Sequence, residues 1–248
     1  MKLNKVEPKY ISKTNPRIGL ITLGSDFRIE KDFNNVVYGK DIDLYVNRIH
    51  CYNPLTNETL AKMAEDITDV TKDILPDQKI DCVAYGCTSG TIAAGYDTIK
   101  SKINLAKPDA KVTTPITSTI KALKKLDIKK ISIFTPYTNA INNSVVTYFK
   151  KENISINSLT YFDIASDLDI GKVDENYLFE VLSKIDLEDS DALFVSCTAL
   201  PILSIIDKLE KKLNKIILSS NQTLIWDALH LIGNKDPVVG FGKIFEAN

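Results

Sequence analysis

The sequence predicts an α/β fold made of two similar, doubly wound parallel-sheet lobes, related by a pseudo-two-fold axis. Three observations predict it. Short apolar runs alternate with helical patterns, the alternation restarts near the middle of the chain, and one cysteine motif occurs in both halves. Strict strand–helix alternation is typical of parallel sheets covered by helices on both faces. We therefore expect an active site in the cleft between the two lobes.

The first half of the chain should contain one complete sheet. Its apolar runs predict strands over 18–23, 44–49, 82–86 and 112–115. Helical spacing predicts helices over 26–33, 56–75 and 89–103. We assign this lobe to residues 1–115 together with the closing segment 222–248.

The second half repeats the pattern and defines the second lobe, residues 116–221. Strands are expected over 131–135, 156–162, 192–196 and 216–218. Helices are expected in this lobe over 117–126, 137–150, 175–185 and 201–213, and the closing helix over 222–231 is assigned to the first lobe. Pro201 should occupy the first turn of its helix, a position that favours proline.

Two cysteines lie in closely matching surroundings. Both Cys87 and Cys197 follow an acidic residue, an apolar run and a small residue, and both precede threonine. In open α/β sheets, the strand ends are where ligands bind. A following helix N-terminus would also lower the pKa of each thiol. We predict that both cysteines are catalytic and face each other, which suits moving a proton on and off carbon.

Polar residues cluster around these strand ends. The hydroxyls of Thr88 and Ser89 follow Cys87 and form a nest suited to carboxylate oxygens, and Thr198 has the matching position after Cys197. Tyr137 follows the strand 131–135, and its phenol could donate to a substrate oxygen.

Two acidic residues follow the first predicted strand. Asp26 is close enough to the strand end to face the cleft, whereas Glu30 is interpreted as a charge stabilised by the N-terminal dipole of the helix. For Asp26 both interpretations stay open.

The other cysteines and the histidines are interpreted as structural. Cys51 and Cys82 lie beside no helix start, and His50 and His230 have no partner at metal-ligand spacing. No HExxH, GxGxxG or P-loop pattern is present. We therefore expect no cofactor, neither a metal nor a nucleotide.

Charge and composition indicate which classes of binding partner and which compartment to expect. The 31 basic and 32 acidic residues give a formal charge of −1 and no basic face, so nucleic acid is not expected. No apolar run reaches the ~18 residues of a membrane span, and the N-terminus resembles no signal peptide. The four cysteines show no disulfide spacing. We expect a reduced, cytoplasmic protein that acts on a small-molecule carboxylate, with a homodimer as one possible assembly.

The two cysteine motifs and two further short stretches resemble a known family. The stretches 86–90 (GCTSG) and 196–201 (SCTALP) resemble the two catalytic loops of the aspartate/glutamate racemase superfamily. The stretches 135–137 (TPY) and 219–222 (SSNQ) look like the branch that holds maleate cis-trans isomerase, arylmalonate decarboxylase and the ectoine-utilisation proteins.

The resemblance implies roles for individual residues. It makes Cys87 and Cys197 the two catalytic cysteines of an isomerase or racemase. It implies substrate contacts for a further set: Thr88, Ser89, Thr198, Tyr137, Asn221, Asp26 and Asp167.

The chain departs from maleate isomerases at two of these positions. Asp26 and Asp167 align with residues that are asparagine in that group. A carboxylate there would repel a dicarboxylate dianion and attract an ammonium or amidinium group. The segments 20–26 and 30–33 look closer to the ectoine-utilisation members. The resemblance therefore also suggests amino-acid or ectoine-type compounds as candidate substrates.

Two alternatives stay open. Arylmalonate decarboxylases keep only the second cysteine, so a decarboxylase would use Cys197 alone as proton donor to a carbanion. A non-catalytic metabolite-binding protein would need neither thiol, and the presence of both Cys87 and Cys197 therefore weighs against it.

Overall fold

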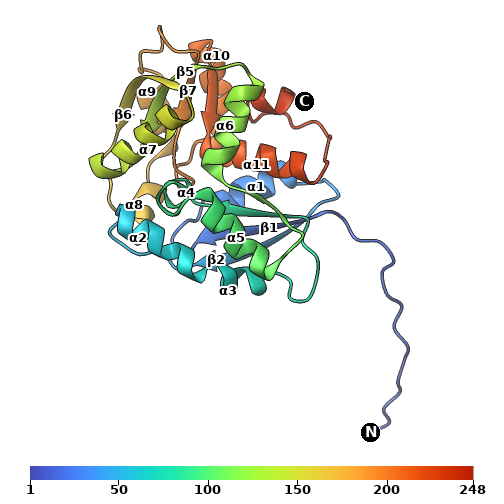
Figure 1. The fold of residues 1–248 in the computed structure, drawn as a ribbon. Helices are drawn as coiled ribbons and strands as arrows, with labels where there is room; N and C mark the ends of the chain where they lie inside the picture. The colour runs from blue at the N-terminus through green and yellow to red at the C-terminus, as the bar shows by residue number, and fades with distance from the viewer. Residues whose placement is uncertain (248) are drawn as a thin grey trace.

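The computed structural model describes residues 1–247, which form two α/β lobes, one above the other in Figure 1. Each lobe is built on a four-stranded parallel sheet, with strand order β2-β1-β3-β4 in the first and β6-β5-β7-β8 in the second. The two orders correspond strand for strand, since β1 matches β5 and β3 matches β7. This confirms the predicted pair of doubly wound parallel sheets.

The strands lie close to their predicted positions. The first sheet contains β1 (Arg17–Leu23), β2 (Asp43–Ile49), β3 (Cys82–Gly86) and β4 (Lys111–Thr113). The second contains β5 (Lys130–Thr135), β6 (Ser155–Tyr161), β7 (Ala192–Val195) and β8 (Ile216–Ser219). The central strands β3 and β7 are buried along their whole length, which explains their unbroken apolar sequences.

Helices connect successive strands and cover the sheets (Figure 1). In chain order, the α-helices are α1 (Ile29–Val37), α2 (Asn57–Lys62), α3 (Ile67–Lys72), α4 (Thr88–Ala94), α5 (Tyr96–Ala106), α6 (Pro115–Lys125), α7 (Asn139–Lys151), α8 (Asp167–Gly171), α9 (Glu175–Leu182), α10 (Ile206–Leu213) and α11 (Ser220–Leu231). Three short 3₁₀ segments are η1 (Met63–Asp66), η2 (Leu203–Ile205) and η3 (Lys243–Glu246).

Some predicted helix boundaries were wrong. The helix expected over 56–75 is divided into α2, η1 and α3, because a 3₁₀ turn keeps apolar residues at a similar spacing. The helix expected over 89–103 is divided at Gly95, whose φ of +85° only glycine adopts freely. Pro201 precedes η2 and α10, so it is not in the first turn of a helix, and Pro115 begins α6 instead of ending a strand.

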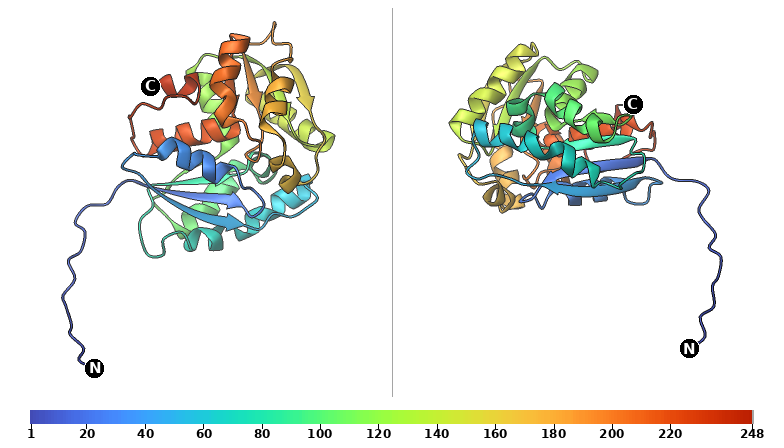
Figure 2. Two further views of the ribbon diagram at one scale, coloured as in Figure 1. Left: turned by 180° about the vertical axis from the view of Figure 1, so that it is seen from behind. Right: turned by 60° about the horizontal axis from the view of Figure 1, so that its bottom comes forward.

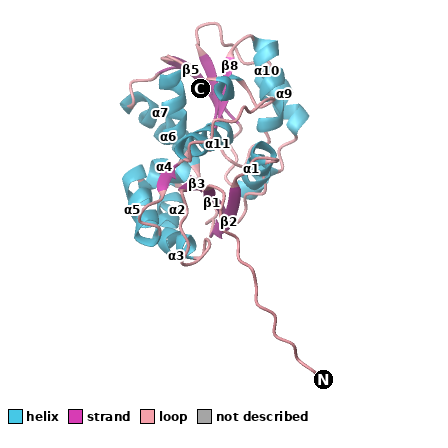
Figure 3. Ribbon diagram, turned by 90° about the vertical axis from the view of Figure 1, so that its right-hand side faces the viewer, coloured by secondary structure: helices cyan, strands magenta, loops and turns pink. Residues whose placement is uncertain are grey.

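Helix α11 lies where the lobes meet. It begins directly after β8 of the second sheet, and it contacts α6, α1 and β3 (Figure 3). Its residues from Ser220 to Leu229 are all buried, as expected for a helix that is covered on every side. The chain therefore carries the start of this helix to the junction of the lobes, while the exact lobe boundaries stay a prediction.

The N-terminal residues 1–16 contain no helix or strand and extend away from the two lobes (Figure 2), except that Asn15 and Pro16 form hydrogen bonds with Asp43 of the first lobe. Within the described residues, no helix is both long and apolar enough to cross a bilayer.

Candidate active site

The candidate site lies where four loops meet, those after β1, β3, β5 and β7. In each sheet these two strands flank the point at which the strand order reverses, where doubly wound folds bind their ligands. The hydroxyl of Thr198, after β7, donates to the Gly86 carbonyl at the end of β3 at 3.3 Å. This bond crosses from one lobe to the other, so the two cysteine loops are in contact.

Cys87 is the N-cap of α4, and its sulfur takes part in the cap. The Sγ accepts a hydrogen bond from the Gly90 N–H at 3.2 Å and lies 3.9 Å from the Ser89 hydroxyl. A Cβ on residue 90 would lie 2.8 Å from this sulfur, so the close approach requires glycine. Burial raises the pKa of Cys87, the Gly90 N–H lowers it in part, and Asp167 raises it again. The resting group is a thiol.

Cys197 has a strained backbone. Its φ of +102° is rare for a residue with a side chain, and such strain is often found at functional positions. Burial raises the pKa of the Cys197 thiol, whereas the neighbouring Ala199 N–H and Tyr137 phenol lower it in part. The carboxyls of Asp167 and Asp26 also raise that pKa. The Tyr137 hydroxyl in turn accepts from Ser196 at 3.4 Å.

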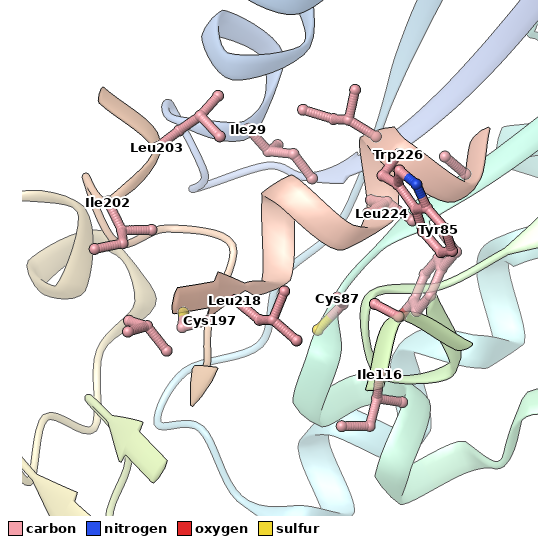
Figure 4. Close-up of a cluster of buried hydrophobic side chains, with 14 of the residues drawn as sticks. Ile29, Tyr85, Cys87, Ile116, Cys197, Ile202, Leu203, Leu218, Leu224 and Trp226 are labelled. Atoms are coloured by element: carbon pink, nitrogen blue, oxygen red, sulfur yellow. The ribbon is translucent and has the colours of Figure 1, made fainter. Parts of the chain in front are cut away.

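The start of α11 holds the two cysteine loops together. Ser220 Oγ accepts from the Thr88 hydroxyl at 2.8 Å and from the Cys197 N–H at 3.0 Å. Asn221 Nδ2 donates to the Thr198 carbonyl at 2.8 Å. Figure 4 shows Cys87 and Cys197 in one close-up with the first turns of this helix.

Asp26 lies buried at the start of α1, and whether it contacts a substrate stays a prediction. Its Oδ1 accepts from the N–H groups of Arg28 at 2.7 Å and Ile29 at 3.1 Å, so it caps the start of α1. The same side chain is 1% exposed, and the Thr198 hydroxyl lies beside it. Burial raises the pKa of Asp26, and these hydrogen bonds offset the rise in part.

Two more carboxyls lie nearby. Asp167, the first residue of α8, accepts from the Ser25 hydroxyl at 2.6 Å, and burial raises its pKa to about 6. Asp32 of α1 accepts from Asn221 Nδ2 at 2.7 Å, and its pKa is raised to about 7 by burial, with Asp26 adding to the effect. Three carboxyls are therefore buried close together in the site.

The structure brings together all the predicted site residues, and each is buried: Cys87, Cys197, Thr88, Ser89, Thr198, Tyr137, Asn221, Asp26 and Asp167. The two lobes also contact each other outside this set of residues. The Arg28 guanidinium donates to the Gly171 carbonyl at 2.7 and 3.0 Å, and the Leu55 N–H donates to Ala165 O at 2.9 Å.

Sequence reasoning did not single out four residues that lie beside these side chains: Ser25, Asp32, Ser220 and Cys51. Cys51 was interpreted as structural, yet its pKa, raised by burial to about 11, also responds to Ser25, Asp167 and Asp26. The signal for Ser220 was available, since it lies in the 219–222 stretch. The others become visible only once the loops are folded together.

The residues that the sequence analysis interpreted as structural, other than Cys51, have contacts outside this group of side chains. Cys82 is buried in β3, and Glu30 pairs with Arg48 at 2.6 Å. His50 packs edge-on against Tyr52, and His230 contacts the Trp226 carbonyl. Among residues 1–247, no group of three or more His, Cys, Asp or Glu side chains is arranged to hold a metal ion.

Known proteins resemble this chain over most of its length. Residues 44–245 match the sequence model of the family described as arylmalonate decarboxylase. A maleate isomerase of Geobacillus stearothermophilus is 28% identical over 199 residues, which are 77% of this chain and 78% of that protein.

Solved structures share the fold. The maleate isomerase Iso from Pseudomonas putida superposes with a TM-score of 0.86 at 20% identity, covering 95% of this chain and all of that one. A mutant maleate cis-trans isomerase of Nocardia farcinica, which carries a covalently bound succinylcysteine intermediate, gives 0.86 at 19% identity over 94% and 99%. The chain belongs to the arylmalonate decarboxylase family, and the resemblance predicted from the cysteine loops is confirmed.

Proposed function

We propose that this member of the arylmalonate decarboxylase family is a cofactor-independent isomerase or racemase that uses Cys87 and Cys197 on a small carboxylate. One observation carries the proposal. Two buried thiols follow equivalent strands of the two lobes, and Ser220 bonds to both of their loops. Two acid–base groups on different lobes can add a proton to a carbon and remove one without a cofactor.

For a cis–trans isomerisation, the chemistry balances with the two thiols alone. The thiolate of one cysteine attacks an alkene carbon, an S–C bond forms, and the π electrons move to the neighbouring carbon. The other thiol protonates that carbon. Rotation about the new single bond, return of a proton from that carbon to the thiolate of the second cysteine and cleavage of the S–C bond give the other isomer. The succinylcysteine in the Nocardia farcinica relative supports this route.

A racemisation would need no S–C bond. One thiolate would remove the proton next to the carboxylate, and the other thiol would return a proton to the opposite face. In both routes the hydrogen bond from the Gly90 N–H would stabilise a Cys87 thiolate, and the Tyr137 phenol and the Ala199 N–H, which lower the pKa of Cys197, would stabilise a Cys197 thiolate.

The substrate carboxylate is assigned to the hydroxyls of Thr88 and Ser89, next to Cys87. An amino-acid or ectoine-type compound fits the proposal better than a dianion such as maleate. The supporting observation is that Asp26 and Asp167 place two buried carboxyls beside the cysteines, where each raises the pKa of Cys197.

A cofactor-free decarboxylase is the second candidate, favoured by the description of the matching family. It would need a single proton donor, Cys197, and it would release carbon dioxide. Cys87 would then be dispensable.

Turnover in deuterated water tests the proposal. The protein and its Cys87→Ala and Cys197→Ala variants are incubated with maleate and a panel of small carboxylates and amino acids, followed by NMR. We expect deuterium at carbon or an isomerised product, lost at least ~10³-fold in both variants because thiolate chemistry is removed. Carbon dioxide release that survives in Cys87→Ala would favour the decarboxylase instead.

A further inference from the structure

We propose that the site contains a nitrogen-binding subsite, formed by Asp26 Oδ2 and Asn221 Oδ1, which takes an ammonium or amidinium group of the substrate. The inference rests on the proposed function, because it assigns a substrate class to the same site. It starts from two buried acceptor oxygens that lack hydrogen-bond partners.

The first acceptor belongs to Asp26. Its Oδ1 is used by the two backbone N–H groups at the start of α1. Its Oδ2 is buried and makes no hydrogen bond of good geometry within residues 1–247, because the nearby Thr198 hydroxyl donates to Gly86 O instead. A buried carboxylate oxygen without a donor is costly, so a bound group that donates N–H bonds would be strongly favoured here.

The second acceptor belongs to Asn221, and its orientation is fixed by its neighbours. Nδ2 donates to the Asp32 carboxyl and to the Thr198 carbonyl. Reversing the amide would place its oxygen against the Thr198 carbonyl, which can only accept. Oδ1 therefore faces away from both, and it is buried without a partner among the described residues.

The two residues that carry the free acceptors both contact Thr198. Its carbonyl accepts from Asn221, and its hydroxyl lies beside the Asp26 carboxyl. Thr198 directly follows Cys197, whose thiol responds to the charge of Asp26. A nitrogen bound between the two acceptors would thus lie next to a reactive sulfur.

The surrounding charge favours a cation over a neutral donor. Asp32 and Asp167 interact electrostatically with Asp26, and each raises the local negative charge when ionised. The two nearby arginines direct their N–H groups elsewhere. Arg28 donates to Gly171 O, and Arg48 donates to Glu30 and to the carbonyls of Leu23 and Asp26.

The substrate class follows from these contacts. It is a small zwitterion, with a carboxylate and a positive nitrogen a few bonds apart. Maleate would instead place a second carboxylate against two bare acceptors and three carboxyls, which is repulsive at every contact.

Binding to a protein without either thiol separates recognition from chemistry. In the Cys87→Ser/Cys197→Ser variant, calorimetry compares cis-4-aminocrotonate, a zwitterion, with maleate, a dianion of similar shape. We expect the zwitterion to bind at least ~10-fold more tightly near neutral pH, because opposite charges attract and like charges repel within this buried site. Adding Asp26→Asn should remove that preference, and its amide oxygen can still cap α1. Glu30→Gln is the matched control and should leave the preference unchanged.

The pH dependence gives a second readout that needs no Asp26 substitution. A cationic ligand favours ionised Asp26, Asp32 and Asp167, so protons leave on binding and affinity should rise between about pH 5.5 and 8. Maleate should show the opposite slope. Equal affinities, no binding of the zwitterion, or an affinity that falls with pH would overturn the subsite. Such a result would leave thiol-dependent turnover untouched, whereas a zwitterion preference without that turnover would contradict the proposed function alone.

Discussion

Replacing Asp167 with asparagine should stabilise the protein, and more so as the pH rises. The carboxyl is 3% exposed, and burial raises its pKa from 3.8 to about 6, despite the hydrogen bond from Ser25. A group whose pKa is raised by folding contributes stability while it is protonated. That contribution is lost as the pH rises from the unfolded pKa through the folded one. Asparagine resembles the protonated carboxyl and can still accept from Ser25.

The magnitude follows from the shift. A pKa that is about 2 higher in the folded protein lowers the free energy of unfolding by about 3 kcal/mol once the pH exceeds both pKa values, near pH 7.5. Near pH 5 the buried carboxyl is mostly protonated. The same relation then gives a difference of about 1.5 kcal/mol in the free energy of unfolding between Asp167→Asn and the parent protein. Both values are upper estimates, because partial opening of the loops would let water reach the carboxylate.

Urea unfolding of both proteins at these two pH values measures the difference. Asp191→Asn is a control of opposite sign, since the N–H groups of Lys129 and Lys130 hold the pKa of Asp191 below its usual value. That variant should lose stability at neutral pH. If Asp167→Asn is no more stable than the parent near pH 7.5, the description of the site as a set of buried, repelling carboxyls is wrong.

Three further predictions concern the reactive groups. Tyr137→Phe should raise the pKa of Cys197 and shift the basic limb of the pH–activity profile to higher pH. Activity should fall by about 10- to 100-fold, the loss expected when a hydrogen bond to a charged group is removed. An unchanged pH–activity profile would exclude this role for the Tyr137 phenol. Gly90→Ala should displace the Cys87 sulfur, because the new Cβ would lie 2.8 Å from it; kcat should fall while the circular dichroism spectrum stays the same, and full activity would show that the cap can shift freely. Chelators should leave turnover unchanged and thiol alkylation should abolish it, with substrate slowing the alkylation because both sulfurs lie in the binding site; activity restored by adding a metal would contradict this.

The sequence contained most of the fold. The strands β3 and β7 are unbroken apolar runs because both of their faces are covered, and the repeated Cys-Thr motif placed the same loop in each lobe. Helix α8 was not predicted, because its five residues are too few to show a helical period. The division at Gly95 depends on one positive φ, which periodicity does not register.

The site was only partly predictable, because its decisive contacts join residues far apart in the chain. The position of Cys87 at a strand end could be inferred from local sequence. The pairing of Ser25 with Asp167, 142 positions apart, could not, because it depends on how the two lobes meet. For Asp26, the local signal indicated a helix cap or a cleft residue. Only the folded structure shows that Asp26 Oδ1 accepts hydrogen bonds from the backbone at the start of α1, whereas Oδ2 makes no hydrogen bond among the described residues.

The central claim is that Cys87 and Cys197 act as one unit, and comparing single and double alanine variants tests it most directly. Groups that act together in one step show strongly non-additive losses. We predict that each single variant loses at least ~10³-fold in kcat/KM and that the double variant is no worse than either, because one missing thiol already blocks the proton exchange. Near-normal turnover in one single variant, or a double loss equal to the product of the two single losses, would contradict the account.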